Sequence, residues 1–372
     1  MSDPAFLDSH APAEAIDVYS LRSLRKLAPY RRPEPLKSSW QVFNTFALYG
    51  LFWWLAYLSL SVSYGLTLLC STVCGLMVAR MFAIQHDCGH GSLYKSRRIQ
   101  NLIGTCCSLF TLIPFHYWRK VHAVHHADLG NLDRRSPGEF PMLTVREFAQ
   151  ASPAKQRFYR IMRNPWVLML IIPAAMFFLS FRTPRTTSEF TSFEKNSVYL
   201  TDLALLALIA ALSSLVGFWN VCLIQIPIHI VMGTIAVWMF YVQHHYENTY
   251  WQWEGELNFF EAAIRGSSFI PLPRFFQWAT GNSGFHYIHH LAPLIPNYSL
   301  ERCHNDNPLF HKHITTLSLR ESLGSLSMAL WDEDSGRLIS FREAEEGAME
   351  GARDEGLGAR EGNKTEASLA QP

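Results

Sequence analysis

The sequence has few charged residues. Of its 372 residues, 17% are Asp, Glu, Lys or Arg, while 49% are hydrophobic and 13% are aromatic. Soluble domains carry about 25% charged residues, so this chain is short of the polar surface that a soluble enzyme exposes to water. It also lacks a basic stripe with interleaved aromatic residues, and its net charge is +1, so we expect no nucleic-acid partner. The composition excludes a disordered chain and favours a membrane protein.

Several cofactor and export patterns are also missing. The seven cysteines, at positions 70, 74, 88, 106, 107, 222 and 303, follow no disulfide, zinc or iron–sulfur spacing. No G-x-G-x-x-G opens a predicted helix and no cytochrome b5-like extension is present, so any electrons must come from a separate protein. The polar segment 1–39 resembles neither a signal peptide nor a transit peptide, and we expect it to lie in the cytoplasm.

Long hydrophobic runs are abundant. Four of them approach the roughly 20 residues that cross a bilayer as a helix: 42–60, 66–84, 198–218 and 221–242. Short uncharged turns separate the members of each pair, which predicts two antiparallel helical hairpins. Two shorter runs, 102–115 and 165–181, are expected to lie in the membrane interface or to re-enter it.

Histidine is frequent, with 16 residues, and its clusters follow the ends of hydrophobic runs. His86 and His90 are four residues apart, so their imidazoles share one face of a helix. Two further clusters have the spacing i, i+3, i+4: His122, His125 and His126, and then His286, His289 and His290. A catalytic zinc takes three protein ligands, so eight imidazoles predict two metal ions. Neutral imidazole binds Zn, Cu, Fe or Ni, and the ligand type alone does not choose among them.

The segments that flank these clusters are also distinctive: 114–122, 130–135, 241–251, 280–282 and 295–298. Together with the three clusters, they resemble the three histidine boxes and flanks of membrane fatty acid desaturases, and most closely the acyl-lipid omega-6 (delta-12) type. The resemblance implies an all-α integral membrane protein. Its four transmembrane helices would form two hairpins, with interfacial helices and a cytoplasmic helical cap that carries a histidine-ligated di-metal site.

The same resemblance implies an O2-dependent oxidoreductase that introduces a cis double bond into an acyl chain of a membrane lipid or other acyl substrate. The expected cofactor is a pair of iron ions (Fe2+/Fe3+), with O2 as co-substrate and a ferredoxin or cytochrome b5-like protein as electron donor. The family has one more histidine ligand before the third box, and His244 matches that position better than His245. The expected metal ligands are His86, His90, His122, His125, His126, His244, His286, His289 and His290. Polar neighbours that would orient them are Asp87, Asp133, Glu247 and Asn282.

Two other function classes use similar clusters. A di-iron hydroxylase or ketolase of a lipid, alkane or carotenoid would have the same boxes, and only the omega-6-like flanks favour desaturation. A metal transporter would place its ligands near the middle of the spans, whereas these clusters follow the ends of the runs. The double-bond position, the chain length, the head group or thioester carrier and the oligomeric state stay open.

Three segments are predicted along the chain: a cytoplasmic N-terminal segment (1–39), a membrane desaturase domain (40–313) and a C-terminal tail (314–372), largely disordered after about 344.

Because the three boxes serve one site, they must lie on one side of the membrane, so one run between the second and third boxes does not cross. Residues 165–181 are that run, since it is the shortest, contains Pro173 and has basic residues at both ends. The positive-inside rule then predicts four spans, with both termini and the active site on the cytoplasmic side of a bacterial inner membrane.

Overall fold

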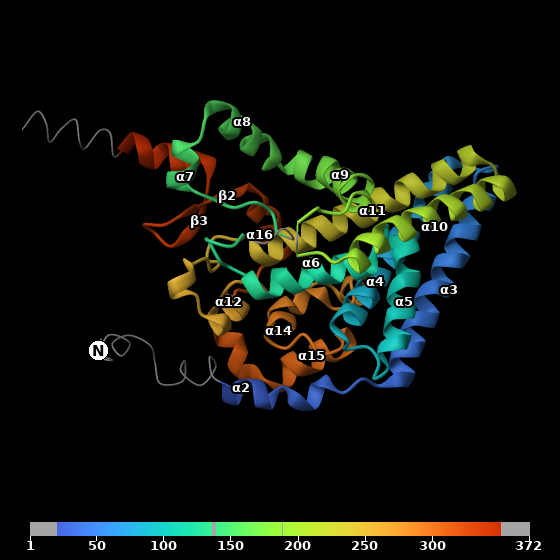
Figure 1. The fold of residues 1–372 in the computed structure, drawn as a ribbon, viewed down its shortest axis with the longest axis horizontal. Helices are drawn as coiled ribbons and strands as arrows, with labels where there is room; N and C mark the ends of the chain where they lie inside the picture. Colours follow the sequence, from blue (N-terminus) through green and yellow to red (C-terminus); the bar gives the residue numbers. More distant parts are fainter. Residues whose placement is uncertain (1–20, 136–138, 188, 351–372) are drawn as a thin grey trace, which may run out of the picture.

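The computed structural model describes residues 21–135, 139–187 and 189–350, and this part of the chain is mostly helical (Figure 1). The α-helices are α2 (Leu21–Lys26), α3 (Pro35–Ser59), α4 (Tyr64–His90), α5 (Arg97–Thr111), α6 (Phe115–Asp128), α7 (Val145–Gln150), α8 (Pro153–Met162), α9 (Ile172–Phe178), α10 (Ser192–Val216), α11 (Phe218–His244), α12 (Phe259–Arg265), α13 (Arg274–Ala279), α14 (His286–Leu291), α15 (Asn297–Asp306) and α16 (Leu319–Gly324). The strands are β1 (Leu143–Thr144), β2 (Met328–Asp332) and β3 (Arg337–Ser340).

Four of these helices, α3, α4, α10 and α11, are long and apolar enough to cross a membrane. They correspond to the four predicted runs, so the expectation of a mostly helical chain with four candidate spans is confirmed. Helices α4 and α11 extend past the predicted runs and end at His90 and His244. The first histidine box and His244 therefore lie on extensions of span helices.

Short turns join the long helices in two pairs. At the first turn, Ser59 Oγ and Thr67 Oγ1 lie 2.9 Å apart, and their hydrogen bond ties the end of α3 to the first turn of α4. At the second turn, Gly217 has a φ of 88°, which glycine adopts without a steric cost. The Asn220 side chain donates a hydrogen bond to the carbonyl of Val216 (2.7 Å) and closes this turn. Helix α3 packs against α4, and α10 packs against α11.

Helix α4 is the central helix of the bundle. In its most apolar window 61% of the residues are buried, against 17% in α3 and in α10. Gly75 permits the close approach of α11, because a Cβ atom added there would lie only 2.7 Å from the Val231 side chain. The outer faces of α3 and α10 expose large apolar side chains such as Trp40 and Leu203, as expected for surfaces that contact lipid.

The two shorter apolar runs form helices of different kinds. The run 102–115 is divided between α5 and α6, and Gly104 of α5 lies directly against the ring of Phe115. The run 165–181 continues from α8 through a sharp bend, because α8 and the segment Val167–Arg182 meet at 69°. Pro173 lies in the first turn of α9, directly after the π-helical turn Val167–Ile171, and its missing N–H interrupts the hydrogen bonds between these two helical segments. This geometry suits either a broken span or a re-entrant element.

A small sheet departs from the expected all-α fold. Strand β2 pairs in parallel with β1 and antiparallel with β3, and it buries Leu330 and Trp331. The sheet lies with α7 and α8 at the end of the molecule opposite the α3–α4 turn (Figure 1). The segment expected to be a tail thus contributes α16, β2 and β3, and residues 341–350 are helical although the composition predicted disorder from about 344. The strands escaped prediction because they are short, and β1 lies far from β2 in the sequence. Residues 351–372 lie outside the described residues.

Candidate metal centre

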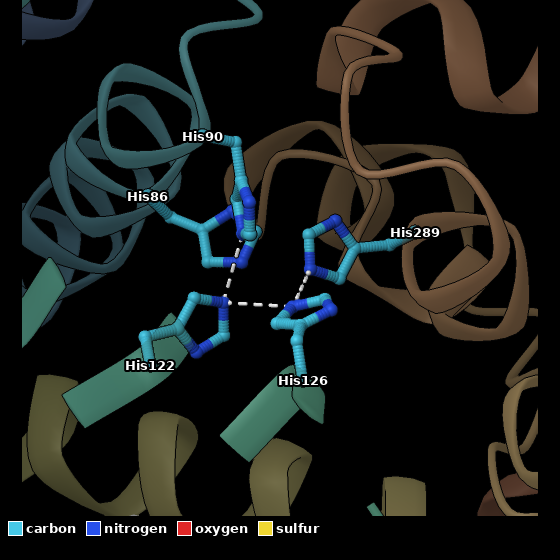
Figure 2. A group of neighbouring side chains, drawn as sticks. All are labelled: His86, His90, His122, His126 and His289. Atoms are coloured by element: carbon cyan, nitrogen blue, oxygen red, sulfur yellow. Dashed lines mark hydrogen bonds between the residues drawn. The ribbon is translucent and has the colours of Figure 1, made fainter. Parts of the chain in front are cut away.

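Nine histidines of the described chain converge in two groups from four helices, α4, α6, α11 and α14. Within each group the potential ligand nitrogens lie within 4.8 Å of one another. The first group, drawn in Figure 2, consists of His86, His90, His122, His126 and His289. The second group consists of His125, His244, His286 and His290, and all four are buried. These are the nine histidines that the sequence predicts as metal ligands.

Helix geometry divides the i, i+3, i+4 clusters between the groups. On α6, His122 and His126 face the first group while His125 faces the second. On α14, His289 joins the first group and the other two histidines join the second. The rings of His126 and His290 stack with centroids 4.2 Å apart, so the two groups are adjacent. This is the arrangement expected of a site for two metal ions.

The imidazole nitrogens within each group approach one another closely. In the first group, His122 Nε2 lies 2.9 Å from His90 Nε2 and 3.1 Å from His126 Nε2, as the dashed lines in Figure 2 show. In the second group, His286 Nε2 lies 3.0 Å from both His244 Nε2 and His290 Nε2. Lone pairs at these separations repel unless a proton or a cation lies between them. The donor set therefore fits metal ions that prefer imidazole ligands.

Hydrogen bonds on the far side of two rings fix which nitrogen faces the second group. His244 Nδ1 donates to the carbonyl oxygen of Gly266 (2.9 Å), so its Nε2 carries the lone pair. His125 Nδ1 lies 2.9 Å from Oε1 of Glu139, and its buried Nε2 has no hydrogen-bond partner among the described residues. Burial lowers the pKa of His125 to about 3, so this imidazole is neutral at pH 7. A neutral ring with its second nitrogen held by a carbonyl or a carboxylate is the usual form of a histidine metal ligand.

Glu139 is an unusual carboxylate, since only 3% of its side chain is exposed. Burial raises the pKa of Glu139 to about 8. A cation held by the neighbouring imidazoles would favour the ionised form and strengthen the hydrogen bond to His125. The second carboxylate oxygen, Oε2, has no hydrogen-bond partner among the residues that the structure describes. A nearby positive charge would therefore stabilise the ionised form of the Glu139 carboxylate.

The sequence model of the fatty acid desaturase family matches residues 63–319, the part of the chain that contains all nine histidines. The chain belongs to the fatty acid desaturase family. A fatty acid desaturase of Bacillus subtilis is 40% identical over 319 residues, which are 86% of this chain and 90% of that protein. The sn-1 oleoyl-lipid 12-desaturase of Synechocystis sp. is 26% identical over 70% of this chain and 75% of its own length. An sn-1 acyl-lipid omega-3 desaturase (ferredoxin) of the same organism is 25% identical over 61% and 63%. The predicted membership and the oxidoreductase class are confirmed.

In this desaturase, two of the four predicted orienting residues lie near the first box. Asp87 Oδ1 lies 3.5 Å from Nδ1 of His86. Its Oδ2 accepts hydrogen bonds from the backbone N (2.7 Å) and the side chain (2.9 Å) of Asn297. Asn282 donates to the carbonyl of Asn297 (2.9 Å), so it reaches His86 only through Asn297 and Asp87.

The other two predicted orienting residues, Asp133 and Glu247, pair with groups other than the histidines. Asp133 accepts a hydrogen bond from the backbone N of Glu254 (2.8 Å). Glu247 forms an ion pair with Arg337 (3.0 Å), with about half of its side chain exposed. Glu247 follows His244 closely in sequence, but α11 ends at His244 and the chain then changes direction. Glu247 is therefore close to His244 in the sequence, but its side chain pairs with Arg337 and not with a histidine of either group.

Six described histidines lie outside both groups, among them His245, His229 and His116. The ring of His245 stacks on Tyr241 with centroids 4.4 Å apart, and its Nδ1 donates to the Tyr241 carbonyl (3.2 Å). His229 has the internal hydrogen bond expected of a histidine inside a span, with Nδ1 2.8 Å from the carbonyl of Gln225. His116 packs against aromatic rings. His244 thus belongs to one of the two groups and His245 does not, and the choice of His244 as a ligand stays a prediction.

Sequence reasoning missed two side chains that contact the histidines. Glu139 has no local signal, because it lies in irregular chain after α6. Trp118 stacks on His122 with ring centroids 4.6 Å apart and an angle of 14° between the planes. Its position four residues before His122 on α6 was a usable signal, since residues at i and i+4 lie on one helix face.

Proposed function

We propose that this desaturase introduces a cis double bond into the acyl chain of a membrane lipid, using two iron ions, O2 and electrons from a separate donor protein. The observation that carries the proposal is the pair of adjacent histidine groups, in which the Nε2 atoms converge. An unactivated methylene has no acidic proton and no leaving group, so acid–base groups alone do not attack it. Iron bound by these imidazoles would supply the oxidising power: O2, two electrons and two protons would be consumed with the two substrate hydrogens, and the products would be the alkene and two water molecules.

The proposed ligands follow the two groups. One iron would be held by His86, His90, His122, His126 and His289, and the other by His125, His244, His286 and His290. Glu139 and the Gly266 carbonyl hold the rings of His125 and His244 from behind, which limits their rotation. The task of the protein is to keep these rings in place and to hold one pair of adjacent C–H bonds of the substrate against them.

The proposed topology places all histidines on one side of the membrane. Helices α4 and α11 both end at histidines, and His244 contacts His286, so the opposite ends of both helices point to the other side. The turns at those opposite ends carry no charged residue, while Arg157, Arg160 and Arg163 accompany α8. We therefore propose four spans in two hairpins, with the helices that carry the boxes forming a cytoplasmic cap. By the positive-inside rule both termini are cytoplasmic, and we assign the chain to a bacterial inner membrane.

The proposed substrate and donor classes are supported by the relatives. The two Synechocystis desaturases are named as acting on acyl lipids, and one is named with ferredoxin. We propose an acyl lipid as the substrate of this chain and a ferredoxin or a cytochrome b5-like protein as its electron donor.

The test is expression in a host that supplies a donor and monounsaturated lipids, followed by mass spectrometry of the acyl chains. We expect diunsaturated chains to accumulate, and we expect purified protein to contain two irons per chain. The matched His86→Ala variant should stay in the membrane, and we expect it to produce no diunsaturated chains. Hydroxylated chains as the main product would assign the protein to the hydroxylases, and a single zinc without iron would contradict the di-iron centre.

A further inference from the structure

A cavity of about 570 Å³ lies beside α4, and none of the nine histidines lines it. Its wall is formed by side chains from α4, α13 and α15. Two of them are arginines, Arg80 and Arg274, and the lining contains one acid, Glu301. Burial lowers the pKa of His304, which also lines this cavity, to about 4, so His304 adds no positive charge at pH 7. The cavity therefore carries an excess of positive charge.

Arg80 is the unusual member of this lining. It belongs to a candidate membrane span, only 6% of it is exposed, and it forms no ion pair with any residue that the structure describes. Its Nε donates to Thr45 Oγ1 (3.1 Å), its Nη1 donates to the Trp278 carbonyl, and its guanidinium lies 4.1 Å from the centroid of the Trp278 ring. Within the described chain no partner is found for Nη2. A buried cation without an anion is costly, and an intramembrane arginine is by default a sign of function.

Two further side chains point to a polar ligand. Arg274 is exposed at the start of α13 and has no carboxylate within 4.0 Å in the described part of the chain. Gln277, one turn later, is nine-tenths buried, and its Nε2 donates to the Ile270 carbonyl (3.0 Å). Its Oε1 is buried and accepts no hydrogen bond from a described residue. The lining thus offers two cations for an anion and one unused acceptor for a hydroxyl or an ammonium group.

We propose that this cavity binds the phosphate ester of a glycerophospholipid headgroup. Arginine presents paired N–H groups that match phosphate oxygens, and a phosphate between Arg80 and Arg274 would supply the missing counter-charge. The surroundings favour a lipid over free phosphate. Next to Arg274, the rings of Phe275 and Phe276 are 55% and 47% exposed, and exposed apolar side chains of this kind are what an interfacial segment buries at the boundary between headgroups and acyl chains. The hydroxyl groups of a glycerol headgroup, or the ammonium group of an ethanolamine headgroup, would donate hydrogen bonds to Gln277 Oε1 and to the Glu301 carboxylate.

The position of the cavity gives such a lipid a structural role. Asn282 and Asn297 line it, and Asn297 donates two hydrogen bonds to Asp87, beside the first histidine box. The bound headgroup would hold α13 and α15 against α4. This inference does not depend on the reaction, because it concerns binding away from the histidine groups.

The test is native mass spectrometry of the full-length protein in detergent with added dihexanoylphosphatidylethanolamine. We expect one tightly bound lipid per chain, and about tenfold weaker binding in Arg274→Gln and in Arg80→Gln, as expected for the loss of a charge-assisted hydrogen bond. Arg274 is exposed, so Arg274→Gln remains informative if Arg80→Gln does not fold. The matched control is Arg302→Gln, since Arg302 lies on α15 outside the lining and pairs with Asp306 (3.5 Å).

Two reference ligands separate the possible sources of the anion. Dihexanoylglycerol, which lacks the phosphate, should bind at least tenfold more weakly than the phospholipid. Inorganic phosphate should not displace the phospholipid at equal concentration. Displacement by phosphate would show a site for a free anion and would overturn the lipid assignment. Equal binding by the wild type and both cavity variants would overturn the site itself.

Discussion

His125 and Glu139 are fourteen positions apart in the chain, yet Nδ1 of the histidine lies 2.9 Å from a carboxylate oxygen of the glutamate, and both side chains are almost completely buried. The imidazole is therefore held from behind while its Nε2 faces the second histidine group. A carboxylate in this position fixes the ring and makes it a stronger ligand.

The first prediction concerns this carboxylate. Replacing Glu139 with Ala should weaken iron binding at the second group by about 10- to 100-fold, the usual effect of removing such a partner. Glu139→Gln keeps an acceptor oxygen without the charge and should have an intermediate affinity. Iron content measured against a graded chelator series checks both variants. If Glu139→Ala holds two irons as firmly as the wild type, the carboxylate does not support the site.

The second prediction compares two neighbouring histidines. His244 Nε2 faces His286, whereas the ring of His245 stacks on Tyr241 outside both groups. We expect His244→Ala to lose iron and turnover as completely as a box variant, and His245→Ala to retain both irons with lower stability. Metal analysis and acyl-chain profiles of the two variants make the comparison. The opposite order would mean that His245 is the ligand.

The third prediction tests the topology. Cysteines introduced at Ser63 and Asn220, in the two turns, should react with a membrane-impermeant maleimide added to intact cells. A cysteine at Ser152, the residue that caps the start of α8, should react only after the cells are opened. The unmodified protein, which has seven cysteines of its own, supplies the background. Labelling of Ser152→Cys in intact cells would show that this segment lies outside; Ser188, another informative position, falls outside the described residues.

The fourth prediction concerns acid stability. Burial, and then the neighbouring His311, lowers the pKa of His304 to about 4, and Tyr287 Oη lies 2.8 Å from its Nδ1. Because the unfolded chain takes up a proton near pH 6.5, its histidine binds more protons than the folded one below that pH, and stability falls as the pH decreases toward 4. Between pH 6.5 and 5 this group should cost about 2 kcal/mol.

The measurement for this fourth prediction is the melting temperature of metal-free protein in detergent across the same pH range. The His304→Gln variant should lose less stability than the wild type on acidification, because it lacks the titrating group. Parallel pH profiles for the two proteins would show that His304 does not contribute.

The fifth prediction concerns the C-terminal strands. A chain that ends at residue 327 lacks the four large buried side chains of β2 and β3: Leu330, Trp331, Leu338 and Ile339. At roughly 2 kcal/mol each, their loss is comparable with the whole stability of a typical domain. We expect this variant to melt far below the wild type, and a chain that ends at residue 350 to melt with the wild type. Equal melting temperatures for both truncations would show that the sheet is dispensable.

The parts of this protein that sequence predicts are those determined by local patterns. A run of about 20 apolar residues identifies a candidate span whatever surrounds it, so all four long helices were predicted. The spacing of His122, His125 and His126 requires only the helical period to bring the three side chains to neighbouring faces of one helix. Spacing therefore selected the eight histidines of the three boxes, the resemblance to the desaturase family added His244, and their role as iron ligands stays a prediction.

The rest depends on tertiary structure. The i, i+4 spacing keeps His122 with His126, but which helices share a group is set by how α4, α6, α11 and α14 are oriented, and no local pattern contains that information. Glu139 reaches His125 from irregular chain, while Glu247, adjacent in sequence to candidate ligands, turns to Arg337. The sheet was missed for the same reason, because the pairing of Leu143 with Leu330 joins distant segments.

The parallel pairing of β1 with β2 also sets the order in which parts of the protein can form during its synthesis. Strand β1 follows the segment that carries Glu139, but its partner β2 comes later in the chain than all four span helices. All four span helices and all nine histidines are made before β2 exists. The loop behind His125 thus acquires its strand partner only after all four span helices have been made, so we expect the second metal site to mature after the helices have entered the bilayer.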